Sequence, residues 1–538
     1  MKKSGQRLLA LLAAVGTAAA MAVQGAVLAS PASAATGTAC GNVTQPTVSG
    51  ATIQSMSTAD KGADLLLNVP AHCEVTLYLT HPGDGDKVQV AVWLPTNGWN
   101  GRFQGTGGGG YAASLQLGDL SLGPNVSTLP SAVQEGYAAA ATDAGIGFNP
   151  LSPTAWALKA DGTVNTGLLT NFAHRSIHDM TVAAKQIVAS FYGQQASYSY
   201  WNGCSTGGRQ GMMEAQRYPD DYDGIMASAS AINWDTFVPS ELWPQVVMND
   251  LKTYPSACKF KVFTDAAIAA CNGGDTVAGG LISQPETCAF DPKSLIGKVI
   301  FCDLTFQTIT AKDAEVVRRI WAGPTSADGQ QVWYGLPKGA AIDMVAGTTS
   351  DLLGRRSGSP NSLIADWVKY FLLKQPSADI AAVTPTQLVS LIGQSQAEYK
   401  EIIGTGDPDL TAFRNRGGKI LSWHGLADQL IFPQGTVDYY KRVQNTMGGA
   451  ASTNDFYRLF LAPGVGHCGI GGNGPVPTNV LASLVNWVEN GQAPATLTSS
   501  TTSLTEGTIT RNICLYPQVA RYNGQGDRKV ASSYHCAA

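Results

Sequence analysis

The sequence contains few charged residues, and neither acidic nor basic residues are in strong excess. Asp, Glu, Lys and Arg make up 14% of the 538 residues, and the formal net charge is −4. We find no dense run of lysine and arginine, which argues against nucleic acid as a partner because such partners are bound through basic surfaces. A hydrophobic content of 44% describes a globular protein large enough for more than one core.

Several binding motifs are also missing. No Gly-x-Gly-x-x-Gly opens a helix and no Gly-Lys-Ser/Thr follows a glycine-rich loop, so nucleotide binding is poorly supported. No Cys-x-x-Cys pair occurs, which argues against a zinc site or a dithiol redox motif. After the N-terminal region no stretch is apolar and long enough to span a bilayer, so we expect no membrane anchor.

Residues 1–34 have the pattern of a secretory signal peptide. Lys2, Lys3 and Arg7 form a positive end, an apolar run covers residues 8–28, and Ala-Ser-Ala at residues 32–34 is typical of a cleavage site. We therefore expect a secreted, extracellular protein. The remaining chain has ten cysteines, and an even number after export is typical of disulfide bonds.

The most informative stretch is a strand, a tight turn and a helix around Ser205. Aromatic residues from Tyr198 favour a strand, the turn reads Gly-Cys-Ser-Thr-Gly, and the residues up to Tyr218 are typical of a helix that ends before Pro219. This is the context of a nucleophile elbow, in which a serine hydroxyl stands exposed above a sheet. The alternative is a chance match in a chain with 60 glycines, but the flanking strand and helix favour the elbow.

Strands alternate with helices on both sides of this stretch, which predicts an α/β fold with a parallel sheet covered on both faces. Residues 235–404 differ, because helical segments there are interrupted by glycine-rich and cysteine-bearing loops. We interpret residues 235–404 as an inserted lid domain and residues 35–234 with 405–538 as the catalytic domain. We expect most of the lid aromatics to form its own core and one or two to face a ligand; they are Trp243, Trp321, Trp333, Tyr334, Trp367, Tyr370 and Phe371.

Ser205, Asp428 and His467 occur in the order Ser, Asp, His, each after an expected strand. Loops at the carboxyl ends of parallel strands meet at one edge of a sheet. A serine hydroxyl needs a base to take its proton, and we expect His467 to act as that base while Asp428 holds its tautomer. The alternatives are a helix-capping role for Asp428 and His424 as a competing base. Because His424 precedes Asp428 on the same strand end, we expect it to pack nearby instead.

The run Gly107–Gly110 follows an expected strand and exposes backbone N–H groups. Such groups can form one half of an oxyanion hole, and a flexible loop is the alternative. The other half would be the N–H of Thr206, at the start of the helix that follows the nucleophile. Of the four glycines we assign the role to Gly109.

These motifs resemble those of the tannase and feruloyl esterase family of α/β-hydrolases. That family pairs a Cys-Ser nucleophile turn with an aspartate and a His-Cys, which correspond here to Cys204-Ser205, Asp428 and His467-Cys468. The resemblance covers nearly the whole mature chain. It implies an α/β-hydrolase core with a large inserted lid and a serine carboxylesterase that needs no cofactor for its chemistry. We also expect a disulfide between the two cysteines, because each adjoins a triad residue.

The resemblance also implies a structural calcium ion in the lid. Its ligands would come from Asn272, Asp275, Val277 and Leu281. Relatives usually carry acidic residues where this chain has Asn272 and Gly279, so Asp275 is the one charged ligand left. Calcium affinity follows the number and charge of oxygen ligands, and binding is therefore an open question.

The cysteines outside the catalytic motif give a less complete pattern. We expect Cys514 and Cys536 of the C-terminal tail to form one bridge. Cys302 departs from the family pattern, and its pairing with Cys258 stays open.

The resemblance names the substrates: esters of plant phenolic acids, with feruloyl (hydroxycinnamoyl) esters expected and galloyl or other small aromatic esters as alternatives. Export would place the enzyme among plant cell-wall esters, and an aromatic-rich lid suits stacking on a planar acyl ring. Two other classes stay open at this point, an inactive hydrolase-fold binding protein and a secreted peptidase. The sequence does not specify an oligomeric state.

Overall fold

The structure is a computed structural model that describes residues 37–538 except for residues 67, 116–125, 148, 274–279 and 504–506. The expected signal peptide lies outside the described residues. So do Asp275 and Val277 of the expected calcium loop. Within the described part of the chain, no helix is long and apolar enough to cross a membrane.

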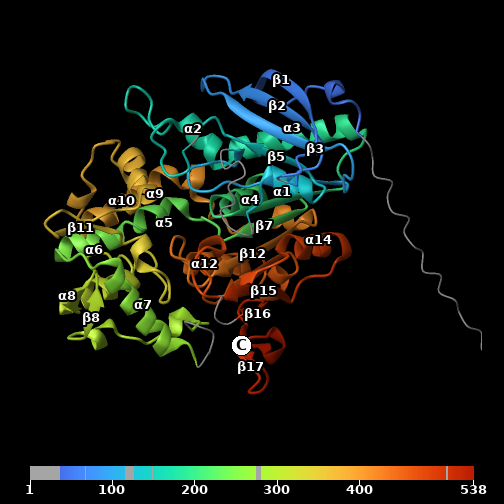
Figure 1. The fold of residues 1–538 in the computed structure, drawn as a ribbon. Helices are drawn as coiled ribbons and strands as arrows, with labels where there is room; N and C mark the ends of the chain where they lie inside the picture. Colours follow the sequence, from blue (N-terminus) through green and yellow to red (C-terminus); the bar gives the residue numbers. More distant parts are fainter. Residues whose placement is uncertain (1–36, 67, 116–125, 148, 274–279, 504–506) are drawn as a thin grey trace, which may run out of the picture.

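A sheet with strand order β1-β2-β3-β5-β4-β6-β7-β12-β13 forms the centre of the molecule (Figure 1). The bounds are β1 Thr52–Lys61, β2 His72–Thr80, β3 Val88–Pro95, β4 Arg102–Thr106, β5 Ala138–Thr142, β6 Tyr198–Cys204, β7 Gly224–Ser228, β12 Lys419–Gly425 and β13 Tyr457–Ala462. Together with its helices this sheet confirms the predicted α/β fold.

The sheet is mixed, whereas the alternating pattern predicted a parallel one. Neighbouring strands from β5 to β13 are parallel, but β1, β2, β3 and β5 pair antiparallel. The reason lies in the connections. Parallel neighbours need a crossover of a dozen or more residues, usually a helix, and the links from β1 to β2 and from β2 to β3 are too short to hold one.

Helices cover both faces of the sheet. The helices α3 Ser176–Tyr192, α4 Thr206–Arg217 and α12 Pro433–Thr446 pack in the apolar cluster on one face, and α1 Leu129–Gln134 and α14 Val480–Asn490 pack in the cluster on the other. Successive residues of a strand point to opposite faces. Accordingly, Trp201 of β6 belongs to the first cluster and its neighbour Tyr200 to the second.

Among the described residues, the segment between β7 and β12 adds no strand to this sheet. It lies to one side of the sheet, in green and yellow in Figure 1. Its helices are α5 Trp234–Ser240, α6 Trp243–Leu251, α7 Ala257–Cys271, α8 Ala311–Ala322, α9 Ser362–Asp366, α10 Pro385–Tyr399 and α11 Thr411–Asn415. Two hairpins accompany them, β8 Val299–Cys302 with β9 Thr305–Thr308, and β10 Thr348–Ser350 with β11 Arg356–Gly358.

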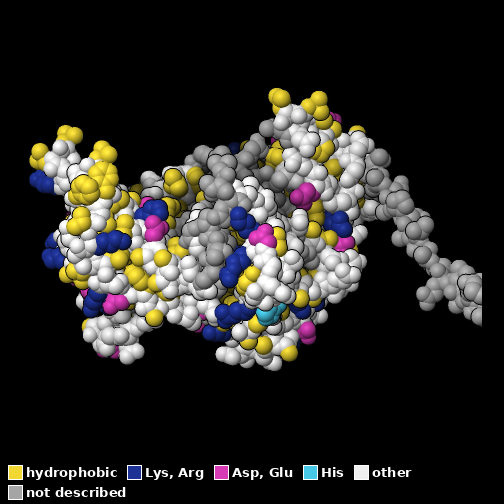
Figure 2. All heavy atoms as spheres, turned by 60° about the horizontal axis from the view of Figure 1, so that its bottom comes forward, with side chains coloured by type: hydrophobic (Ala, Val, Ile, Leu, Met, Phe, Trp, Pro, Cys, Tyr) yellow, Lys and Arg dark blue, Asp and Glu magenta, His cyan; other side chains and the backbone are white. Residues whose placement is uncertain are grey.

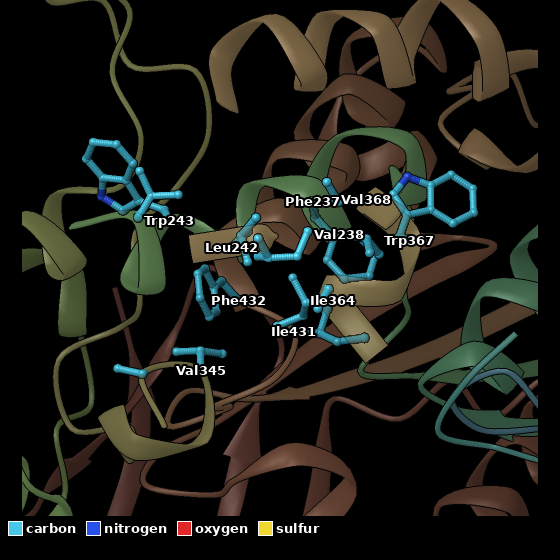
Figure 3. Close-up of a cluster of buried hydrophobic side chains, with 14 of the residues drawn as sticks. Phe237, Val238, Leu242, Trp243, Val345, Ile364, Trp367, Val368, Ile431 and Phe432 are labelled. Carbon is cyan, nitrogen blue, oxygen red and sulfur yellow. The ribbon is translucent and has the colours of Figure 1, made fainter. Parts of the chain in front are cut away.

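This segment shares one apolar cluster with loops of the central sheet. Figure 3 shows Phe237 and Val238 of α5 beside Ile364 of α9 and beside Ile431, which follows β12. Most of the aromatics noted above are buried in this cluster or packed against it, as expected. The segment is therefore held firmly against the edge of the sheet where β12 ends.

The described C-terminal part adds two small sheets. The strands are β14 Val476–Pro477, β15 Thr496–Ser503, β16 Gly507–Cys514, β17 Val519–Tyr522 and β18 Tyr534–Ala537.

All ten cysteines are paired, as Cys40–Cys73, Cys204–Cys468, Cys258–Cys302, Cys271–Cys288 and Cys514–Cys536. On the face shown in Figure 2, basic and acidic side chains are both scattered, in keeping with the small net charge.

Candidate active site

Ser205 lies in the sharp turn between β6 and α4. Its backbone has φ 64° and ψ −124°, a conformation that a residue with a side chain rarely adopts. Backbone hydrogen bonds hold it there: the N–H of Ser205 donates to the carbonyl of Ser228, 3.0 Å away, and its own carbonyl accepts from the N–H groups of Arg209 and Ala231. This strained turn is the geometry by which an elbow presents a hydroxyl above the sheet.

Three glycines let the neighbouring backbones meet at this turn. A Cβ on Gly203 would lie 2.5 Å from the carbonyl carbon of Gly207, and one on Gly107 would lie 2.6 Å from the Cα of Gly207. Any larger residue would push the loop 107–110 away from the elbow. The glycine-rich loop is therefore packed against the nucleophile turn and is not a free loop.

Two N–H groups beside Ser205 are without partners in the described residues. The N–H of Gly107 donates to the carbonyl of Asn202, and the N–H of Gly108 donates to Oε1 of Gln210. The N–H of Gly109 donates no hydrogen bond among the described residues. Thr206 begins α4, so its N–H has no intrahelical acceptor. Both residues line the same cavity as Ser205, and both N–H groups are available to an anionic oxygen.

Asp428 and His467 form a buried pair in the loops after β12 and β13. Nδ1 of His467 lies 2.9 Å from Oδ2 of Asp428, so Nδ1 carries a proton and Nε2 is left to act as a base. The N–H groups of Leu430 and Ile431 donate to the other carboxylate oxygen at 2.9 and 2.8 Å. Burial alone would raise the pKa of Asp428, but His467 and His424 outweigh it and hold that pKa well below its ordinary value.

His424 supports Asp428 from the side away from the cavity. It is fully buried, and its Nε2 lies 3.1 Å from Oδ2 of Asp428 and 2.8 Å from the carbonyl of Ile431. Its Nδ1 lies 2.9 Å from the hydroxyl of Thr436. With both ring nitrogens engaged and no place in the cavity wall, His424 does not compete with His467 as a base.

A disulfide ties the nucleophile turn to the histidine loop. Cys204 and Cys468 are bonded across a separation of 264 residues, with their Cα atoms 6.0 Å apart, and both are buried. Ser205 and His467 line one cavity. No hydrogen bond joins the Ser205 hydroxyl to the imidazole among the described residues, and catalytic bonds of this kind often tighten only when substrate binds.

The cavity over Ser205 has a volume of about 250 Å³ and an almost entirely apolar wall. Its aromatic residues are Trp234 and Phe237 of α5. We expected one or two of the seven lid aromatics to face a ligand, but none of them lines the described wall of this cavity, and most are buried in the apolar cluster or packed against it. The sequence gives no signal for which face of α5 meets the cavity, because every residue of the helix is buried, including the polar Asp235, Thr236 and Ser240.

The expected calcium loop is only partly described. Asn272 caps the end of α7 and Leu281 is buried against Ile509, while Asp275 and Val277 lie outside the described residues. The described ligands are neutral, one amide and one backbone carbonyl. Calcium sites draw affinity from six to eight oxygens with several carboxylates. The residues present therefore fit a calcium ion poorly, and binding there stays a prediction that depends on Asp275.

The chain is similar to known proteins over almost its whole length. A family model described as tannase and feruloyl esterase matches residues 73–537. A probable feruloyl esterase from Arthroderma benhamiae is 45% identical over 511 residues, which cover 93% of each chain. A mono(2-hydroxyethyl) terephthalate hydrolase from Piscinibacter sakaiensis is 31% identical and covers 87% of this chain and 85% of its own.

A solved structure gives the same result at the level of the fold. The tannin acyl hydrolase from Aspergillus niger matches with a TM-score of 0.81 and 28% identity, over 93% of this chain and 94% of its own.

Proposed function

This chain belongs to the tannase and feruloyl esterase family and is a carboxylic ester hydrolase, and we propose that it is a secreted serine esterase that hydrolyses esters of plant phenolic acids, with feruloyl esters preferred. The observation that carries the proposal is the cavity over Ser205. It is apolar, it contains two aromatic side chains, and no Lys or Arg lines its described wall. A neutral aromatic acyl group suits such a wall.

In the proposed mechanism, Ser205 and His467 act in two steps. The Ser205 hydroxyl attacks the ester carbonyl while Nε2 of His467 takes its proton. The tetrahedral intermediate collapses, the bond to the alcohol breaks, and the imidazolium returns the proton to the leaving alkoxide. Water then attacks the acyl-enzyme with the same base, which releases the phenolic acid and restores Ser205. Asp428 keeps the proton on Nδ1 and stabilises the imidazolium throughout.

The oxyanion would be bound by the N–H groups of Thr206 and Gly109. The support is that both are unpartnered in the described structure and lie beside Ser205 at the start of a helix. The positive end of the α4 dipole favours a negative charge at this point. Each donor of this kind contributes about 3 kcal/mol to the transition state.

Galloyl esters are the close alternative within the same chemistry, and other small aromatic esters follow. A cinnamoyl group places its ring two carbons farther from the carbonyl than a galloyl group does. The test is the ratio of kcat/KM for methyl ferulate to that for methyl gallate on the purified enzyme. A ratio clearly above one supports the feruloyl assignment, and a clear preference for gallate would replace it and leave the serine esterase mechanism intact.

An inactive binding protein on this fold is the rival from another class. Against it stand the hydrogen-bonded Asp428–His467 pair and the strained Ser205 turn, which a scaffold would have no need to keep. A peptidase is disfavoured because the cavity has a volume of only about 250 Å³ and its wall is mostly apolar, which does not suit an extended peptide with its polar backbone. Hydrolysis of a p-nitrophenyl ester, with casein as a second substrate, separates the three.

We also propose that residues 235–404 act as a lid that sets specificity. This segment supplies Phe237, Val238 and Leu363 to the cavity wall, while the three proposed catalytic side chains come from outside it. Secretion is supported by the signal-like N-terminus and by five disulfides, which persist in oxidising compartments.

A further inference from the structure

Among its described residues, the cavity wall contains one acidic side chain whose presence the triad does not explain. Glu241 follows helix α5 and lines the cavity, and only 4% of its surface is exposed. Its Oε1 is fully buried and has no hydrogen-bond partner. Buried polar atoms are almost always hydrogen-bonded, so an orphan of this kind calls for an explanation.

Asp428 shows by contrast what a structural carboxylate looks like in the same site. Its oxygens meet two backbone N–H groups and two histidines. Glu241 has no such set. Its neighbours in the wall include Phe237 and Val238, and neither Lys nor Arg lines the described part of the cavity. The side chain is therefore not held by a structural ion pair.

The surroundings of Glu241 favour the neutral form of its side chain. Burial raises its pKa well above the ordinary value, and the negative charge of Asp428 raises it further. A neutral carboxyl group offers one O–H donor and one carbonyl acceptor. It can therefore form two hydrogen bonds with a partner that itself both donates and accepts.

We propose that Glu241 is a specificity-determining residue that binds the ring hydroxyl of a phenolic ester in the cavity over Ser205. The inference rests on the proposed function and deepens it. The apolar wall receives the ring, and the Glu241 carboxyl group meets the ring hydroxyl of the phenol. A ring carboxylate would find no Lys or Arg along the part of the wall that the structure describes, which directs the site to phenols and away from acidic aromatic esters.

The physical basis of selectivity is the unpaired acid. A site built around a hydrogen bond to a substrate hydroxyl rejects the analogue that lacks it, because the buried group then stays unsatisfied. Methyl 4-hydroxycinnamate and methyl cinnamate differ by that hydroxyl alone. The preference for the first over the second is therefore a direct readout of Glu241.

The experiment measures binding separately from catalysis. Calorimetry on the Ser205→Ala protein gives the Kd of both esters, alone and with Glu241→Leu or Glu241→Gln added. We expect the hydroxylated ester to bind about tenfold more tightly, the Leu variant to abolish that ratio, and the Gln variant to keep most of it. The matched control is Leu151→Ala, an exposed apolar wall residue, which should weaken both esters alike.

A Leu variant that keeps the full ratio would overturn the assignment. Thermal melting checks that this variant is folded, and Glu241→Met repeats the test if it is not. The protein with Ser205 intact is assayed in parallel on the same two esters. If it hydrolyses neither while the binding ratio still depends on Glu241, the proposed function fails and the assignment of the residue stands.

Discussion

Removing the disulfide between Cys204 and Cys468 is expected to damage both stability and catalysis. The perturbation is the double variant Cys204→Ala/Cys468→Ala, in which small apolar side chains replace two buried sulfurs. The bond closes a loop of 264 residues, and chain entropy gives such a closure about 5–6 kcal/mol. Unfolding of about 500 residues carries an entropy near 1 kcal/mol per kelvin, so the expected fall in Tm is about 5 °C.

The expected catalytic effect follows from position, because Cys204 and Cys468 are the chain neighbours of the proposed catalytic residues Ser205 and His467. Without the bond, the loop bearing His467 is free to move relative to the turn bearing Ser205. A displacement of about 1 Å in such a site can cost 100-fold in rate. We therefore expect kcat on methyl ferulate to fall by about 10- to 100-fold at a temperature well below the lowered Tm.

The matched control removes another disulfide by Cys514→Ala/Cys536→Ala. That bond closes 22 residues, for which the same entropy gives about 3 kcal/mol and a loss of about 3 °C. It lies in the C-terminal strands, outside the wall of the cavity, so kcat should stay at the wild-type level. If the catalytic-site pair also leaves kcat unchanged, the bond stabilises the fold and does not position the triad.

Three further predictions concern single groups. Asp428→Asn should preserve the fold but leave His467 in the wrong tautomer, and kcat should fall by about 10³- to 10⁴-fold; substantial activity would move the acidic role to another residue. Burial raises the pKa of Asp235 to about 6, so its ionisation destabilises the native state as pH rises from about 4 to 6, and Asp235→Asn should raise Tm near pH 8 but hardly near pH 3.5. An equal gain in Tm at both pH values would show that the variant is stabilised by something other than the removal of a buried charge. Treatment with EGTA should move Tm by less than about 2 °C, because the described ligands at Asn272 and Leu281 are neutral, and a larger fall that added calcium reverses would show a bound ion.

The catalytic part was the most predictable part of the molecule, because its signals are local. The sequence marks each element of this part by the spacing of its apolar residues or by a residue that ends the element. These elements are the strand before Ser205, the helix after it, and the strands before Asp428 and His467. Parallel strands then bring their carboxyl ends together without further information. The Ser–Asp–His order and the neighbouring cysteines follow from the same short motifs.

The wall of the cavity was not predictable in the same way. Trp234, Phe237 and Glu241 lie on or next to a short helix whose residues, polar and apolar alike, are all buried, so its sequence does not say which of them face Ser205. Packing of α5 between the sheet and the cluster behind it decides that. The antiparallel half of the sheet was likewise set by the short links after β1 and β2, which an alternating pattern does not show.

The central claim is that Ser205 is the nucleophile of an esterase acting on phenolic esters. The most direct measurement is kcat/KM for methyl ferulate in the wild-type protein and in Ser205→Ala, with circular dichroism to show that both are folded. The account predicts clear hydrolysis by the wild type and a loss of about 10⁴-fold or more in the variant. Turnover by folded Ser205→Ala within about tenfold of the wild type would contradict it.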